Sequence, residues 1–372
     1  MKLQLEKLEL SEIELPLKWP FETSFGRTTK RRIMIVRAFD KSGARGYGEC
    51  TAPEDPFYNH ETIETAWLIV TGFVAPLLSA ARVERAESVN EALSRIRGNR
   101  MAKGGVEAAI WDLEARLHGK PLWQHIGGLR TEIDCGVSIG LQRTTEALLE
   151  KVGLELESGY QRIKIKIAPG RDIELVKAVR SKYPDIRLTV DANSAYTLAD
   201  TDLLKQLDDY SLMMIEQPLA PGDIVDHAKL QRELATPICL DESILTVADA
   251  RHAIELGSCK IINVKLGRVG GHTEARAIQE YSRNRGVPVW CGGMLESGIG
   301  RAHNIAMSTL TGFTLPGDVS ASARYWEKDI IDPPVTVSPQ GTIQAPSGVG
   351  LGYDVNEGRI ESLTKRRESL SL

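Results

Sequence analysis

Three acidic residues stand at equal intervals in the middle of this 372-residue chain. Asp191, Glu216 and Asp241 end the short apolar runs RLTVDAN, LMMIEQP and PICLDES, about one strand–helix unit apart. One such Asp is often only a helix N-cap, but three carboxylates on successive strands converge in space and form a divalent-cation site. Because no His or Cys accompanies them, the set predicts Mg²⁺ rather than zinc, with Mn²⁺ as a substitute.

Three lysines flank these carboxylates along the chain. Lys164 and Lys166 lie in RIKIKI, one unit upstream, and Lys265 lies in INVKLG, one unit downstream. Lys164 and Lys166 share one face of their strand, because side chains alternate along it. A lysine beside a second cation and a metal has a lowered pKa and can act as a base near neutral pH. Lys166 and Lys265 are therefore predicted to be bases on opposite faces of one carbon.

Such a site suits one class of reaction. A carbon acid next to a carboxylate is very weak, and its dianionic enolate is reachable only with a metal ion and nearby cations. The predicted chemistry is proton abstraction α to a carboxylate, through an enediolate. Asn193 and Glu242 stand next to two of the predicted ligands and are expected to orient them, with helix capping as the alternative.

One motif points to different chemistry. GVSIG, residues 136–140, matches the G-x-S-x-G pattern that carries the nucleophile of serine hydrolases. The pattern is short, no HGGG-type run accompanies it, and a hydrolase would leave the lysines unexplained. We expect Ser138 instead to end the first barrel strand and to donate a hydrogen bond to the substrate. A binding or hydrolytic protein that uses Ser138 is the alternative class.

These polar residues stand at the ends of a repeating pattern. From about residue 133, short apolar strands alternate with amphipathic helices at a period typical of βα units. The pattern predicts an α/β fold with a (β/α)8, TIM-like barrel over residues 131–324, whose active site lies at the C-terminal strand ends. The eight predicted strands are CGVSIG, RIKIKI, RLTVDAN, LMMIEQP, PICLDES, IINVKL, PVWCGG and FTLPGD.

The two flanking segments differ from this repeat. Residues 1–130 begin with strand-like alternation and continue with helical periodicity. The tail, residues 325–372, is rich in Pro and Gly at its start. We expect the tail to return to the N-terminal third, so that both segments form one α+β capping domain beside the barrel.

Composition excludes several classes of protein. A net charge of −4 without a basic stripe argues against a nucleic-acid partner. The five cysteines are odd in number and scattered, which indicates buried reduced thiols and a cytoplasmic location. The N-terminal MKLQLEKLEL is too charged for a signal peptide, and we expect no segment to be long and apolar enough to span a membrane. A homo-oligomer is expected, as is common for such barrels.

Longer motifs carry a resemblance to a known family. The set KIK, DAN, IEQP, LDES and NVKLGRVGG resembles the enolase superfamily, muconate-lactonizing subgroup, over nearly the whole chain. FETSFG, RMAKGGVEAAIWDLEA, CGVSIG, GYQRIKIKIAPG, VWCGGMLESGIGRAHN and TLPGDVSAS are similar, more narrowly, to the o-succinylbenzoate synthase / N-acylamino acid racemase family. The resemblance implies a Mg²⁺-dependent enzyme acting on a small carboxylate. Its reaction would be dehydration to o-succinylbenzoate in menaquinone synthesis, racemisation of N-acyl (N-succinyl) amino acids, or both.

The same resemblance implies roles for single residues. Lys166 would be one base, and Lys265 the opposite base in racemisation or the cation that stabilises the enediolate in dehydration. Lys164 would help to hold the substrate carboxylate. Arg268 resembles an arginine of members that racemise N-acylamino acids, with a solvated helix-start residue as the alternative. Further substrate contacts are expected from Phe21, Phe25, Tyr58, Ser138, Gly292 and Met294.

Two alternatives lie within the same superfamily, a dipeptide epimerase and a muconate-type cycloisomerase. Dipeptide epimerases typically carry an Asp-x-Asp after the eighth strand, which binds the substrate ammonium. Here TLPGDVSAS contains a single aspartate, Asp318, which favours the synthase/racemase family. The sequence leaves open whether dehydration or racemisation is the physiological reaction, and which acyl group is preferred.

Overall fold

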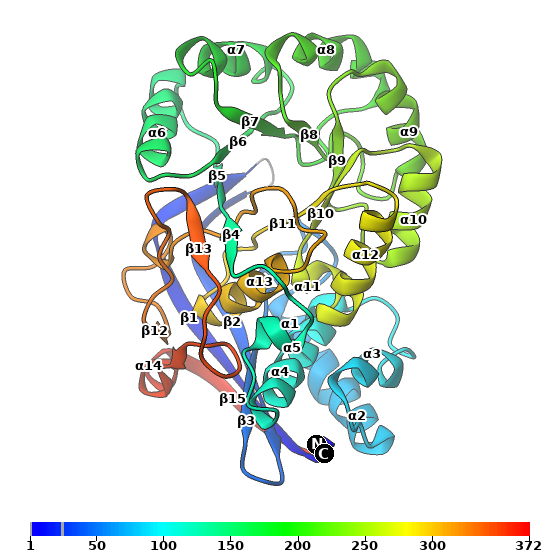
Figure 1. Ribbon diagram of the computed structural model, residues 1–372, viewed down its shortest axis with the longest axis vertical. Helices are drawn as coiled ribbons and strands as arrows, with labels where there is room; N and C mark the ends of the chain where they lie inside the picture. The colour runs from blue at the N-terminus through cyan, green and yellow to red at the C-terminus, as the bar shows by residue number, and fades with distance from the viewer. Residues whose placement is uncertain (1, 24–25) are drawn as a thin grey trace.

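The chain forms a curved parallel sheet ringed by helices and, beside it, an antiparallel sheet with helices of its own (Figure 1). The computed structural model describes residues 2–23 and 26–372. The parallel sheet with its surrounding helices occupies the upper part of Figure 1, and the long N-terminal strands, in blue, run from the level of this sheet toward the lower end of the view. This architecture confirms the prediction of a TIM-like barrel with an α+β cap, whereas the domain boundaries at residues 130 and 325 stay predictions.

The cap sheet joins the two ends of the chain. Its strand order is β15-β1-β2-β3, and β15 pairs antiparallel with β1, with Ser371 opposite Lys7. The C-terminal tail therefore returns to the N-terminal third, as expected. Alternate residues of β1, such as Leu8 and Leu10, are fully buried. The strands are β1 (Leu5–Thr23), β2 (Gly26–Asp40), β3 (Arg45–Cys50) and β15 (Thr364–Ser371).

Helix α4 (Arg100–Leu117) lies directly on strand β3, and glycines make this contact possible. A Cβ atom at Gly46 would lie 2.2 Å from the backbone nitrogen of Leu113, and one at Gly48 would lie 2.1 Å from the carbonyl oxygen of Gly105. Only residues without a side chain permit so close an approach of strand and helix. Further cap helices are η2 (Ala86–Ser88), α3 (Val89–Ala92) and α5 (Leu122–His125).

One helical stretch of the cap contradicts an expectation from the sequence. Ile63–Ala81 is long and apolar enough to cross a membrane by length and composition, so the prediction that no segment would be is wrong. In the structure, 39% of its most apolar window is buried. Trp67 is buried, and its Nε1 donates to Oε2 of Glu368 on β15 at 2.9 Å. The stretch consists of α1 (Ile63–Ile69), the π-helical η1 (Val70–Val74) and α2 (Ala75–Ala81).

The barrel sheet has seven parallel strands in chain order, from β5 to β11. The strands are short and mostly buried, as expected where helices cover the outer face. They are β5 (Gly136–Ile139), β6 (Arg162–Lys166), β7 (Arg187–Asp191), β8 (Met214–Glu216), β9 (Ile238–Leu240), β10 (Ile261–Val264) and β11 (Val289–Cys291).

Helices alternate with these strands and cover the outside of the curved sheet (Figure 1). Helices α6, α9 and α10 begin at a Thr or Asp whose side chain accepts a hydrogen bond from the first turn. The helices are α6 (Thr145–Glu157), α7 (Ile173–Lys182), η3 (Leu198–Asp200), α8 (Thr201–Lys205), η4 (Gln206–Tyr210), α9 (Ile224–Glu233), α10 (Val247–Leu256), α11 (Leu266–Val269), α12 (His272–Asn284) and α13 (Gly298–Ser308).

The predicted eighth strand, FTLPGD, is reduced to two isolated bridges. Phe313 bridges Val289 at the start of β11, and Gly317 bridges Cys135 just before β5. The segment therefore closes the barrel without forming a regular strand. Pro316 explains the difference, because it has no N–H for a sheet ladder. The carbonyl oxygen of Pro316 instead accepts a hydrogen bond from a barrel side chain, as described below.

The tail after the barrel forms short pieces that connect both parts. β13 (Thr342–Gln344) pairs with β4 (Glu132–Asp134), and β12 (Ile331–Asp332) pairs with β14 (Asp354–Val355). The 3₁₀ turn η5 (Ser322–Arg324) precedes β12, and α14 (Glu357–Leu363) leads into β15.

Buried glutamates of the cap hold the N-termini of barrel helices. The carboxylate of Glu107, on α4, accepts hydrogen bonds from the backbone N–H groups of His272 and Thr273 at the start of α12, at 2.7 and 2.9 Å. Glu49, on β3, accepts from the N–H groups of Ser297 and Gly300 at the start of α13. Burial raises the pKa of Glu49 to about 7. These contacts dock the cap on the barrel and so place it beside the strand ends.

Candidate active site

The predicted catalytic residues meet at one end of the barrel because the strands are in register. In the parallel ladder, Lys166 of β6 stands opposite Asp191 of β7, and Asp191 stands opposite Glu216 of β8. Asp241 follows the last residue of β9, and Lys265 follows the last residue of β10. The C-terminal ends of five adjacent strands therefore bring all five side chains to one place.

Lys166 and Lys265 each pair with a carboxylate of this cluster. Nζ of Lys166 lies 2.6 Å from Oδ2 of Asp191, and Nζ of Lys265 lies 2.7 Å from Oδ2 of Asp241. Lys265 also donates to the hydroxyl of Tyr58, from the cap, at 3.2 Å. Burial works to lower the pKa of Lys265, but the surrounding acidic groups outweigh it and raise that pKa.

Lys164 lies deeper in the barrel and contacts three carboxylates. Its Nζ is 2.8 Å from Oε2 of Glu216, 2.9 Å from Oδ2 of Asp318 and 3.3 Å from Oδ2 of Asp191. Burial would lower the pKa of Lys164, but these three anions raise it. Burial likewise raises the pKa of Asp191, yet the lysines beside it lower that pKa to about 2. Both groups therefore stay charged near neutral pH.

The donor chemistry of the cluster fits a hard divalent cation. Asp191, Glu216 and Asp241 are almost wholly buried, stand on neighbouring strands and offer oxygen ligands, which Mg²⁺ prefers. Within residues 2–23 and 26–372, no three acidic, His or Cys side chains are arranged as a ready-made ligand set, since each carboxylate is turned to a cation. The magnesium site stays a prediction that the donor types and their burial support.

Asn193 and Glu242 connect the charged groups rather than capping helices. Oδ1 of Asn193 accepts from Nζ of Lys166 at 2.7 Å, and its backbone N–H donates to Oδ1 of Asp191 at 3.0 Å. Asn193 has a φ of 42°, a left-handed conformation that turns it back over the strand end. Its Nδ2 donates to Oε1 of Glu242 at 3.2 Å. Burial raises the pKa of the Glu242 carboxyl.

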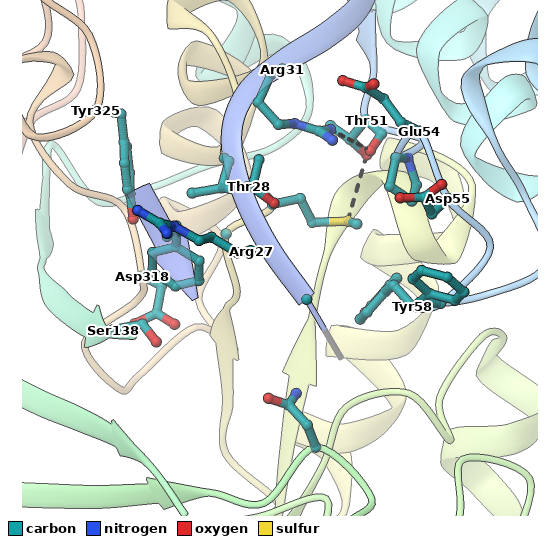
Figure 2. Close-up of a pocket in the computed structure, with 18 of the residues that line it drawn as sticks. Arg27, Thr28, Arg31, Thr51, Glu54, Asp55, Tyr58, Ser138, Asp318 and Tyr325 are labelled. Atoms are coloured by element: carbon teal, nitrogen blue, oxygen red, sulfur yellow. Dashed lines mark hydrogen bonds between the residues drawn. The ribbon is translucent and has the colours of Figure 1, made fainter. Parts of the chain in front are cut away.

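A cavity of about 330 Å³ opens over these residues, between the barrel and the cap (Figure 2). Lys164, Lys166, Lys265, Asp191 and Asn193 line its barrel side. The cap closes the other side with residues 26–31 of β2 and with the segment that contains Pro53 and Tyr58. Of the predicted substrate contacts, the following line this cavity: Phe21, Tyr58, Ser138 and Met294. Phe25 lies outside the described residues.

Two predicted substrate contacts, Gly292 and Arg268, do not line the cavity. A Cβ atom at Gly292 would lie 2.3 Å from Oδ1 of Asn263 and 2.8 Å from Cγ of Lys265, so this glycine leaves space for the lysine stem. Arg268 is 1% exposed, and its guanidinium forms an ion pair with Oδ1 of Asp241. The solvated alternative is therefore wrong for Arg268, because its guanidinium is buried against Ile244, Asn263 and Asp241, whereas its predicted substrate contact stays a prediction.

Three buried polar residues were missed by the sequence analysis as parts of the site. Arg162 donates to the carbonyl oxygen of Pro316 at 3.0 Å and to Oδ1 of Asp318 at 2.5 Å. Asn263 donates from Nδ2 to Oε1 of Glu216 at 2.7 Å. The alternation of side chains along strands carries a usable signal, since Arg162 is two residues before Lys164 and shares its face. For Asp318, only the fold shows the contact with Lys164.

Comparison with known proteins agrees with this geometry. Residues 7–127 match the model of the mandelate racemase / muconate lactonizing enzyme N-terminal domain, and residues 147–359 match the enolase C-terminal domain-like model. The chain therefore belongs to the mandelate racemase / muconate lactonizing enzyme family of the enolase superfamily.

Similar proteins within this family have two named activities. The chain is 49% identical to the o-succinylbenzoate synthase of Geobacillus stearothermophilus, over 98% of this chain and 97% of the relative. It is 47% identical to the N-succinylamino acid racemase of Thermus thermophilus, over 97% and 98%. A solved structure of an enolase superfamily member from Listeria innocua, 44% identical, superimposes with a TM-score of 0.96 over 99% of both chains.

Proposed function

We propose that this protein removes a proton α to a carboxylate and acts as an o-succinylbenzoate synthase, as an N-succinylamino acid racemase, or as both. One observation carries the proposal. Lys166, at the end of β6, and Lys265, at the end of β10, line the same cavity, with Asp191 lining it as well. Two amines from separate strands of a curved sheet can reach one carbon from two directions, which racemisation requires.

Each lysine has a distinct task in this reaction. Lys166 takes the α-proton from the substrate. In racemisation, Lys265 returns a proton on the opposite face, whereas in dehydration it remains a cation that stabilises the developing negative charge. Lys164, held by three carboxylates, binds the substrate carboxylate as a fixed positive charge. When bound between Asp191, Glu216 and Asp241, Mg²⁺ supplies the further positive charge that makes the carbon acid strong enough.

The names of the relatives indicate the substrate class. The synthase and the racemase have in common a succinyl group in the compounds that they are named for. Both reactions begin with the same proton abstraction, so one site can perform both. The proposed substrates are therefore small carboxylates that carry a succinyl group.

The dipeptide epimerase alternative receives less support. A dipeptide has a free ammonium group, and in dipeptide epimerases aspartates after the eighth strand bind it; here the aspartate at that place is Asp318. Both oxygens of Asp318 are already engaged, Oδ1 by Arg162 and Oδ2 by Lys164. A substrate ammonium near these two cations would be repelled.

The serine hydrolase alternative also receives less support. Ser138 lies within strand β5, and the next helix, α6, begins only at Thr145. A nucleophile elbow would need a sharp turn directly at the serine. No histidine is among the described residues that line the cavity, so Ser138 has no general base there.

Activity on two substrates tests the proposal. Purified protein with Mg²⁺ is assayed for dehydration of the cyclohexadiene carboxylate precursor of o-succinylbenzoate, and for loss of optical rotation from N-succinyl amino acids. We expect turnover of at least one substrate, removed by EDTA and restored by Mg²⁺, and the ratio of rates ranks the two activities. Turnover of neither would reject the substrate assignment. A homo-oligomeric state and a cytoplasmic location stay predictions.

A further inference from the structure

The two ends of the cavity differ in charge. Figure 2 shows Arg27, Tyr325, Ser138 and Asp318 together at one end, and Glu54, Asp55 and Tyr58 at the other. The labelled residues of the first end come from β2, from β5 and from the chain after β11, whereas those of the second end come from the cap segment that follows β3. A long substrate with one anionic tail would therefore bind in one direction, with that tail away from the two acidic residues.

Three cations of strand β2 line the cap side of the cavity, and two of them already have partners within the protein. Lys30 forms an ion pair with Glu14, 2.7 Å from Nζ to Oε2. Arg31 is buried, donates to the carbonyl oxygen of Thr51 at 2.8 Å and lies in the field of buried Glu49. Lys30 is therefore paired with an acid of the cap, and Arg31 is buried and held by a backbone carbonyl.

Arg27 is the third cation, and its guanidinium is not engaged in this way. It lines the cavity and is exposed. Glu22 stands opposite Arg27 in the β1–β2 ladder, but in the described part of the chain the guanidinium makes no ion pair with it or with another acid. Asp318, at the same end, is satisfied by Arg162 and Lys164. Arg27 thus offers a fork of N–H donors suited to a carboxylate.

We propose that Arg27 binds the second carboxylate of the substrate, the one at the far end of its succinyl group. The inference rests on the proposed function, in which Lys164 and the strand ends bind the carboxylate next to the reacting carbon. The acyl tail then extends past Ser138 and Tyr325 to Arg27. The rest of the substrate points to the opposite end, which Tyr58 and Phe57 line. Arg27 is in this view a specificity residue for dicarboxylic over monocarboxylic substrates.

Kinetics on a pair of isosteric substrates test this assignment. An N-succinyl amino acid and its N-succinamoyl analogue have the same shape, but the analogue carries a neutral amide in place of the distal carboxylate. Arg27→Met is expected to raise KM about tenfold for the succinyl compound only, with kcat unchanged. KM for the succinamoyl compound should change less than about twofold, and Arg27→Lys should recover part of the loss. Lys30→Met is the matched control, because Glu14 already pairs with Lys30.

Titration calorimetry with the same two compounds gives a readout without turnover. The assignment stands if wild type prefers the charged compound and Arg27→Met loses that preference. It is overturned if Arg27→Met changes both compounds equally, if Lys30→Met has the same effect as Arg27→Met, or if wild type and Arg27→Met bind alike. Absence of turnover by wild type on both succinyl substrates would reject the proposed function separately, since binding is still measured.

Discussion

Asp318 and Lys164 form a buried ion pair inside the barrel, with 2.9 Å between Oδ2 and Nζ. The other oxygen of Asp318 accepts from Arg162, whose guanidinium stacks over the Trp290 ring at 4.5 Å. The pair fixes the positive charge of Lys164 at the base of the cavity. Because both oxygens of Asp318 are engaged, this carboxylate is not available to bind a substrate cation.

Asp318→Asn is expected to lower the free energy of unfolding by about 3 kcal/mol, because it leaves Arg162 as a buried charge without a carboxylate partner. KM for the substrate should rise as well, since Lys164 loses one of its three anchors. Urea denaturation and steady-state kinetics measure the two effects. Asp329→Asn, a buried aspartate that accepts from Ser322, is the control and should leave KM unchanged. Wild-type stability in Asp318→Asn would contradict the prediction.

Dipeptides with a free amino terminus should be poor substrates. At the end of the cavity where Asp318 lies, their ammonium would meet the cations Arg162 and Lys164, which already engage both oxygens of Asp318. We expect kcat/KM to be at least about a hundredfold below that for N-succinyl amino acids, a difference of about 2.7 kcal/mol. Proton exchange at the α-carbon, followed by NMR in D₂O, measures both. Comparable exchange of dipeptides would restore the epimerase alternative.

Lys166→Ala and Lys265→Ala should show which lysine removes the α-proton from each face of the substrate carbon. If each lysine serves one enantiomer, each variant loses α-proton exchange of that enantiomer by roughly 10³-fold and keeps exchange of the other. Both should lose racemisation, because it needs both bases. NMR of the two enantiomers in D₂O gives the result. Retention of exchange for both enantiomers in either variant would exclude the two-base arrangement.

Asn263→Ala should weaken divalent-cation binding about tenfold, because its Nδ2 orients Oε1 of Glu216, a predicted ligand. Titration with Mn²⁺ followed by electron paramagnetic resonance measures the affinity without an activity assay. Asn304→Ala is the matched control, since Asn304 is also buried and donates to a glutamate, Glu296, outside the cluster. EDTA should abolish wild-type activity and Mg²⁺ restore it. Equal Mn²⁺ affinity in Asn263→Ala and Asn304→Ala would show that Asn263 does not support a metal ligand.

Acid should destabilise the protein through the buried histidine pair of His272 and His303, whose ring nitrogens lie 2.9 Å apart. Burial lowers the pKa of both below the usual 6.5. Above pH 6.5 neither state binds the proton, so the pair has no effect there. As pH falls below 6.5, only the unfolded chain gains protons, so stability is lost by up to about 1.4 kcal/mol per pH unit and histidine.

Urea midpoints at pH 7.5 and 5.5 measure this loss. His272→Gln should reduce the difference between the two pH values, because one of the two buried groups no longer titrates. His252→Gln, at an exposed position, should not. An identical pH dependence in wild type and His272→Gln would show that other groups dominate.

Much of the site could be anticipated from local pattern. Period-two alternation in RIKIKI and a polar residue at the end of each apolar run place Lys164, Lys166 and Asp191 at strand ends, since parallel strands in one sheet share their direction. The regularity of the eighth strand was overestimated, because FTLPGD is largely apolar. Pro316 within it has no N–H to donate to a strand ladder. The apolarity of the stretch Ile63–Ala81 was underestimated, and only the fold shows that Trp67 within it is buried and donates to Glu368 of β15.

The sequence by itself determined the fold class, the chemical types of the cluster and the family, because these depend on residue identity and spacing along the chain. Tertiary structure alone decided which charges meet. Lys164 pairs with Asp318, Arg268 pairs with Asp241, and Lys265 contacts both Asp241 and the hydroxyl of Tyr58. The reason is physical: ion pairing and desolvation depend on distances between segments far apart in the chain, which only the closed barrel and its cap establish.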